Sequence, residues 1–197
     1  MIERTAKNTV INWIEHGKDA LLITGARQIG KTYLIRECLE LSKIPYIELN
    51  FIDNPELVDL FANAKDTKDL TMRLSLTGKG RLESGKTIIF LDEIQEFKEI
   101  VTRIKFLVEE GSYRYIMSGS LLGVELRDLR SAPVGYLRIC DMYPLSFMEF
   151  AQAVGIHQDT FDALKSSFQK RQPVDEFVHK KMLDVFYLYL IVGGMPE

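Results

Sequence analysis

The sequence contains little of what marks secreted, metal-binding or membrane-spanning proteins. Its 197 residues include only two cysteines, Cys38 and Cys140, which lie too far apart for metal-ligand spacing and predict reduced thiols. The longest apolar run, residues 185–192, is too short to cross a bilayer. No apolar signal region opens the chain, and the net charge of −3 gives no general attraction to nucleic acid or anionic lipid. We therefore expect a cytoplasmic protein with no membrane partner.

What the sequence does contain is a regular alternation of apolar runs and amphipathic segments. Apolar residues make up 46% of the chain and charged residues 27%, which is typical of a globular protein. Short apolar runs predict five strands, at residues 20–24, 46–49, 87–91, 113–117 and 136–142. Helical spacing predicts helices at residues 2–15, 31–41 and 94–109, and two short helices within 55–76. This alternation favours an α/β fold, a mostly parallel sheet covered by helices on both faces.

After Pro144 the pattern becomes helical and stays so to about residue 192, with interruptions near Gly155 and Pro173. Ser146 is a candidate cap for the first of these helices. We expect a core domain at residues 1–143 and a small lid-like helical subdomain at residues 144–197.

A glycine-rich segment connects the first predicted strand to the next helix. Residues 25–32 read GARQIGKT, which fits the pattern G-x-x-x-x-G-K-[ST] in the strand-to-helix context that it requires. Glycines let main-chain amides turn toward an anion, and the start of the helix adds positive potential. Lys31 would then reach the β- and γ-phosphates of a nucleotide, and the Thr32 hydroxyl would bind Mg²⁺. The alternative is a tight turn with an incidental lysine and threonine. The predicted nucleotide-binding residues of this segment are Gly25, Ala26, Gln28, Ile29, Gly30, Lys31, Thr32 and Tyr33.

Two carboxylates end the most apolar predicted strand, in the segment TIIFLDEI at residues 87–94. A carboxylate beside a buried strand is costly unless it meets a cation or solvent. Asp92 is therefore predicted to help hold Mg²⁺, and Glu93 to orient and deprotonate an attacking water. With Lys31, they form the predicted catalytic set. The alternative is that both carboxylates cap the helix that begins near Ile94.

Two further groups are candidates for sensing the nucleotide. Ser118 and Ser120 follow the fourth predicted strand, where a small polar side chain could detect the γ-phosphate, although a simple Ser-Gly turn would explain them as well. Arg127 and Arg130 would share one helix face, and either could act as an arginine finger on the nucleotide of a neighbouring copy in a homo-oligomer. Pairing with nearby surface carboxylates is the alternative for both arginines.

The order of five segments resembles one family of prokaryotic AAA-superfamily ATPases. The segments are GARQIGKT, FLDEIQ, SGS, YPLSFMEF and GGMPE. Members of that family carry an N-terminal ATPase module followed by a C-terminal domain of unknown function, and they are similar to archaeal-type and STAND ATPases. The first two segments occur in many ATPases, whereas YPLSFMEF and GGMPE are more specific to the family.

The resemblance implies a P-loop NTPase three-layer sandwich with a parallel five-stranded sheet in the order 5-1-4-3-2. It also implies ATP, rather than another nucleotide, as the cofactor together with Mg²⁺. Many relatives have Gly-Arg before the fifth strand, where this chain has Gly135 and Tyr136, so no finger is predicted there, although Arg138 follows. Relatives continue past GGMPE, and we expect any DNA or protein partner to be bound by that further domain.

Three functions are compatible with these residues. The first is Mg²⁺-dependent ATP hydrolysis that energises a partner or a DNA transaction. The second is a nucleotide-gated binding switch with little intrinsic hydrolysis. The third is a P-loop kinase, against which the adjacent carboxylates and the long helical tail argue mildly. Replacement of Glu93 separates the first two, because only hydrolysis needs a base.

Overall fold

The computed structural model of the protein describes residues 2–77, 80, 82–120 and 135–196. Its residues group into two compact units. The first is Ala6–Met142, and the second combines residues 2–5 with residues 143–196. The chain therefore passes between the units twice, once after Thr5 and once after Met142.

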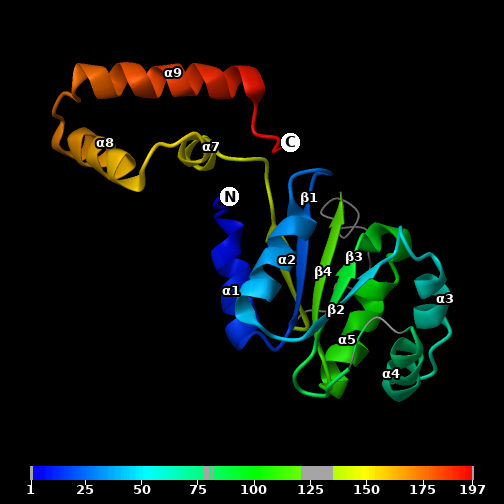
Figure 1. Ribbon diagram of the computed structural model, residues 1–197. Helices are drawn as coiled ribbons and strands as arrows, with labels where there is room; N and C mark the ends of the chain where they lie inside the picture. Colours follow the sequence, from blue (N-terminus) through cyan, green and yellow to red (C-terminus); the bar gives the residue numbers. More distant parts are fainter. Residues whose placement is uncertain (1, 78–79, 81, 121–134, 197) are drawn as a thin grey trace. The chain divides into compact units, whose positions relative to one another are not determined.

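The first unit is built on a five-stranded sheet whose neighbouring strands are all parallel (Figure 1). Its strands are β1 (Ala20–Gly25), β2 (Tyr46–Asn50), β3 (Ile88–Asp92), β4 (Arg114–Ser120) and β5 (Leu137–Asp141). They lie in the order β2-β3-β4-β1-β5. This is the predicted order read from the other edge, so both the α/β fold class and the strand order are confirmed.

Helices cover both faces of this sheet because its strands are apolar on both sides. In β3, Ile88 and Phe90 belong to one buried cluster, whereas Ile89 and Leu91 belong to the other. The first cluster includes residues of α1 (Ala6–His16) and α2 (Lys31–Ser42). The second includes residues of α3 (Glu56–Ala62), α4 (Thr67–Leu76) and α5 (Ile100–Glu110). Figure 1 shows these two helical layers on opposite sides of the sheet, which completes a three-layer sandwich.

Two predicted helices have different bounds in the structure. The segment predicted as one helix over 94–109 is a 3₁₀ turn, η1 (Ile94–Phe97), followed by α5. Ile94 and Phe97 are both buried, and the three-residue repeat of a 3₁₀ turn brings them to the same side. The first helix begins at Ala6 rather than at residue 2, since residues 2–5 belong to the other unit.

The second unit contains three helices, α7 (Phe147–Ala153), α8 (Gln158–Lys170) and α9 (Glu176–Val192). Ser146 caps α7 as predicted, and Glu149 completes the capping box by accepting a hydrogen bond from the Ser146 amide. A small buried cluster of Leu145, Phe150, Ala151 and Val185 joins α7 to α9. The N-terminal segment is held to the same unit, because the Thr5 amide and hydroxyl both donate to the Glu149 carboxylate.

None of the helices in the described part of the chain is both long enough and apolar enough to cross a membrane.

Candidate functional site

The glycine-rich loop connects the end of β1 to the first turn of α2, and its backbone favours glycine at both glycine positions of the pattern. Gly25 has φ of 154°, and a Cβ there would lie 2.1 Å from the carbonyl oxygen of Met142. Gly30, the residue before α2, has φ of 88° in the left-handed region. Gln28 also has positive φ, at 61°. These conformations curl the loop, and Ile29 anchors it because its side chain is fully buried.

The Lys31 ammonium lies under this loop. Its Nζ donates to the carbonyl oxygens of Gly25, at 3.1 Å, and Ala26, at 2.6 Å. Burial lowers the pKa of Lys31 below its ordinary value, although the charges of Glu93 and Asp92 act in the opposite direction. Loop carbonyls are weak partners for an ammonium group compared with phosphate oxygens. The lysine therefore stands where an anion entering the loop would meet it.

Three side chains from three different elements donate hydrogen bonds to Asp92. Thr32 on α2 donates from Oγ1, at 3.2 Å from Oδ1 and 3.1 Å from Oδ2. Asn50 at the end of β2 donates from Nδ2 to Oδ2 at 3.2 Å, and the Ser118 hydroxyl on β4 donates to Oδ1. The predicted pair of Thr32 and Asp92 thus lies together, and Asp92 is only 2% exposed.

Burial dominates the electrostatics of this carboxylate. It raises the pKa of Asp92, and the charge of Glu93 acts in the same direction. Hydrogen bonds from Ser118 and Thr32 oppose that rise. An ionised carboxylate that is disfavoured by burial gains from a nearby cation. Hydroxyl and carboxylate oxygens are the ligands that Mg²⁺ accepts beside phosphate oxygens, so the donor set of Thr32 and Asp92 fits this ion.

Glu93 lies directly after β3, in a left-handed conformation with φ of 58°. It occupies the position before η1, yet its side chain makes no capping bond. Instead, its Oε2 accepts a hydrogen bond from Nε2 of Gln95. The same amide accepts from the Ser120 main-chain N–H, at 3.0 Å from Oε1. The interpretation of Asp92 and Glu93 as helix caps is therefore not supported by their hydrogen bonds.

Sequence reasoning missed two residues of this site, Asn50 and Gln95. Asn50 is the last residue of β2 and pairs in register with Asp92. A polar residue that ends an apolar strand was a usable signal, because parallel strands present their carboxyl ends at one edge. Gln95 carried no comparable signal, since its reach to Glu93 and Ser120 depends on the 3₁₀ turn.

The remaining predicted site residues lie in different parts of the structure. Ser120 is buried at the end of β4 and pairs in register with Gly25, so it lies beside the loop. Tyr33 is 60% exposed on α2.

Arg127 and Arg130 lie outside the described residues. Arg138 pairs with Asp19, at 3.1 Å, and is in register with Leu21 near the start of β1. It therefore lies at the opposite end of β1 from the loop.

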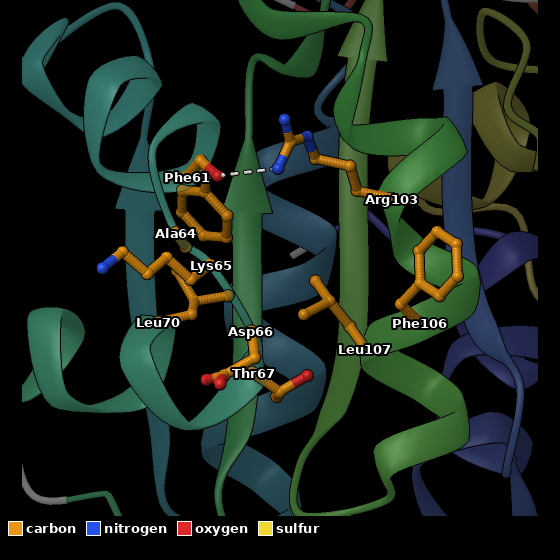
Figure 2. Close-up of a pocket in the computed structure, with 9 residues that line it drawn as sticks. All are labelled: Phe61, Ala64, Lys65, Asp66, Thr67, Leu70, Arg103, Phe106 and Leu107. Atoms are coloured by element: carbon orange, nitrogen blue, oxygen red, sulfur yellow. Dashed lines mark hydrogen bonds between the residues drawn. The ribbon is translucent and has the colours of Figure 1, made fainter.

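A separate cavity of about 490 Å³ opens between α3, α4 and α5 (Figure 2). Its lining includes Phe61, Leu70, Phe106 and Leu107. Figure 2 shows Arg103 reaching from α5 to the carbonyl oxygen of Phe61, a contact of 3.1 Å. No residue of the loop or of the Asp92 cluster lines this cavity, so it is distinct from the candidate site.

The family comparison agrees with this geometry. The profile of the family described as AAA domain matches residues 17–151, which include the whole sheet and the loop. The chain belongs to the AAA domain family. It is an AAA-type P-loop ATPase module, and this membership supports nucleotide binding and hydrolysis in general terms.

Solved structures share the fold of this AAA domain at low sequence identity. A Walker-type ATPase of Pyrococcus abyssi has a TM-score of 0.57 and 15% identity, over 100% of this chain and 65% of that one. The Hsp104–ADP complex of Saccharomyces cerevisiae has a TM-score of 0.52 and 18% identity, over 78% of this chain and 24% of that one. The Orc1 protein of Aeropyrum pernix, solved with DNA, has a TM-score of 0.52 and 16% identity, over 77% and 48%.

The chain thus spans less than two thirds of the length of these similar structures. No curated protein sequence matches the chain.

Proposed function

We propose that this AAA domain binds ATP with Mg²⁺ and hydrolyses it, and that the energy drives a change in a partner protein or in DNA. The observation that carries the proposal is the meeting of Thr32, Asn50 and Ser118 on the buried Asp92 carboxylate, beside the loop that holds Lys31. A loop of amides, a lysine, a hydroxyl and a buried carboxylate together match what a metal-bound triphosphate requires.

Each residue then has a distinct task. Lys31 exchanges its bonds to the Gly25 and Ala26 carbonyls for bonds to phosphate oxygens. Thr32 and Asp92 would hold Mg²⁺, which supplies neutralisation of the charge on the phosphates when it is bound. Glu93 orients a water molecule and takes its proton.

The end of β4 would report the state of the nucleotide. Ser118 holds the Asp92 carboxylate, and Ser120 lies beside the loop at Gly25. A change at the γ-phosphate would reach these side chains first. We further propose a homo-oligomer in the cytoplasm in which Arg127 or Arg130 of a neighbouring copy completes the site, with DNA or protein bound by a further domain. Turnover by a single copy would then be slow, since such an arginine is worth about 10³–10⁵ in rate.

Nucleotide titration with matched variants tests the proposal. We expect the wild-type chain to bind ATP in a Mg²⁺-dependent manner, with GTP as a weaker competitor, and Lys31→Ala to abolish binding. Glu93→Gln should keep binding but reduce turnover at least about 100-fold, because it removes the base. Thr32→Val, which keeps the shape of the side chain but lacks the hydroxyl, should lose the Mg²⁺ dependence.

Two outcomes would contradict ATP hydrolysis. Binding without turnover, even in concentrated wild-type protein with DNA, would favour the nucleotide-gated switch. No binding at millimolar ATP would contradict both hydrolysis and the switch.

A further inference from the structure

Gln95 belongs to the hydrogen-bond network of the site, but the proposed function gives it no role. Its side-chain amide makes two hydrogen bonds to two different elements. Nε2 donates to Oε2 of Glu93, and Oε1 accepts from the Ser120 amide at the end of β4, at 3.0 Å. A side-chain amide carries a donor and an acceptor on separate atoms, so it can form both bonds at the same time without a charge. Both halves of the Gln95 amide are therefore in use.

The main chain that carries Gln95 is firmly held. Its neighbour Ile94 is fully buried, and Phe97, at the end of the same 3₁₀ turn, is 6% exposed. Phe97 packs against Phe51, with ring centroids 5.8 Å apart. The backbone fixes where the side chain begins, and its two hydrogen bonds to different elements then restrict its rotamers. The amide can therefore act as a rigid support.

Glu93 needs such a support more than the other residues of the site. Its side chain is only partly buried, and no helix cap or ion pair that the structure describes holds its carboxylate. A glutamate side chain has three rotatable bonds, and a misplacement of a reacting group by about 1 Å can cost about 100-fold in rate. The bond from Gln95 restricts the carboxylate to one direction.

We infer that Gln95 is a positioning residue for hydrolysis, and that it couples Glu93 to the end of β4. The inference rests on the proposed function, because it gives Glu93 the role of base. Through Ser120, which pairs in register with Gly25, a displacement of β4 beside the phosphate loop is passed to the Glu93 carboxylate. In this inference Gln95 acts on the reaction through Glu93, to which its amide is bonded.

Two substitutions separate the two bonds of the amide. Gln95→Met has a similar length and removes both bonds. Gln95→Glu keeps an oxygen that can accept from the Ser120 amide, but it faces Glu93 with a carboxylate oxygen instead of a donor. We expect both variants to lower kcat about 10- to 100-fold, because Glu93 loses its orientation, while KM and the ATP dissociation constant change less than about twofold.

A merely structural role would give a different pattern. Gln95→Glu would then keep wild-type kcat, because the bond to β4 survives. Equal or higher kcat in either variant overturns the inference, and so does a loss of ATP affinity that parallels the loss of kcat.

A double-variant cycle with Glu93→Gln gives an independent readout. If Gln95 acts through Glu93, adding Gln95→Met to Glu93→Gln should lower the residual single-turnover rate by less than about twofold, since coupled residues are non-additive. A further tenfold loss in the double variant would overturn the inference. Lys31→Ala serves as the control for the proposed function: if wild type shows no Lys31-dependent turnover, the proposed function itself fails, whereas Lys31-dependent turnover that Gln95→Met leaves intact contradicts only the role of Gln95.

Discussion

The two units of this chain bury their apolar residues to very different extents. In the first unit, every residue of β3 is buried, and helices close both faces of the sheet. In the second unit, α8 and α9 are both described in full by the structure. No residue of α8 is buried, and Val185 is the single buried residue of α9. Within the apolar run at residues 185–192, Ile191 is 83% exposed. Apolar content therefore predicts burial in β1, β3 and β4 but not in the C-terminal helices.

A core substitution in the first unit should have the largest effect. Phe90 is fully buried in the centre of β3, and Phe90→Ala should lower the free energy of unfolding by about 3–5 kcal/mol, through lost burial and the cavity that remains. Trp13, the single tryptophan, is buried in the same cluster and reports the transition by fluorescence. Phe106→Ala, at a 63% exposed residue of α5, is the matched control and should cost less than about 0.5 kcal/mol. Equal costs for both variants would contradict the assignment of the core.

The same substitution in the second unit should cost less. Phe150 is 8% exposed and packs against Tyr189, with ring centroids 5.3 Å apart. Because its cluster is small, we expect Phe150→Ala to lower the local stability of α7 and α9 by about 2 kcal/mol, as measured by hydrogen exchange of their amides. Phe168→Ala on α8, where the side chain is 86% exposed, should leave this exchange unchanged. A comparable loss from Phe168→Ala would show that α8 packs in solution on a surface that the structure leaves open.

The smallest expected effect concerns the contacts of Arg4 and Thr5 with Glu149, which hold the N-terminal segment to the second unit. This effect depends on pH. Burial raises the pKa of Glu149, but hydrogen bonds from Thr5 and Ser146 and the charge of Arg4 outweigh it and lower the pKa overall. A lowered folded-state pKa gives stability that is present above the ordinary pKa range of a carboxyl group and is lost as the pH falls through the folded value.

Glu149→Gln should therefore cost about 1 kcal/mol at neutral pH, because the amide oxygen replaces only part of these bonds, and the difference from wild type should vanish in acid. Hydrogen exchange of α7, measured from neutral pH down to about pH 3, follows both proteins. A difference that stays constant with pH would rule out this role of the carboxylate.

Most of the candidate site was visible in the sequence because its parts are local. The glycine spacing around Lys31 and the carboxylates after an apolar strand are patterns of neighbouring residues, and the structure places Thr32 within hydrogen-bond distance of Asp92. Asn50 was missed because its contact with Asp92 depends on the register of β2 against β3. Arg138 was not predicted as a finger, and it lies at the far end of β1, where it pairs with Asp19.

Short apolar runs and helical spacing were enough to predict the five strands and most of the helices, and the residue type of Ser146 predicted its cap. Each of these features depends on residues that are near one another in the chain. The strand order followed only from the family resemblance. Tertiary structure alone decided that Asn50 and Ser118 converge on Asp92, and that a 3₁₀ turn lets Gln95 reach from Glu93 to Ser120. The physical reason is that such contacts join segments distant in sequence, and their geometry exists only once the sheet has fixed which strand ends lie side by side.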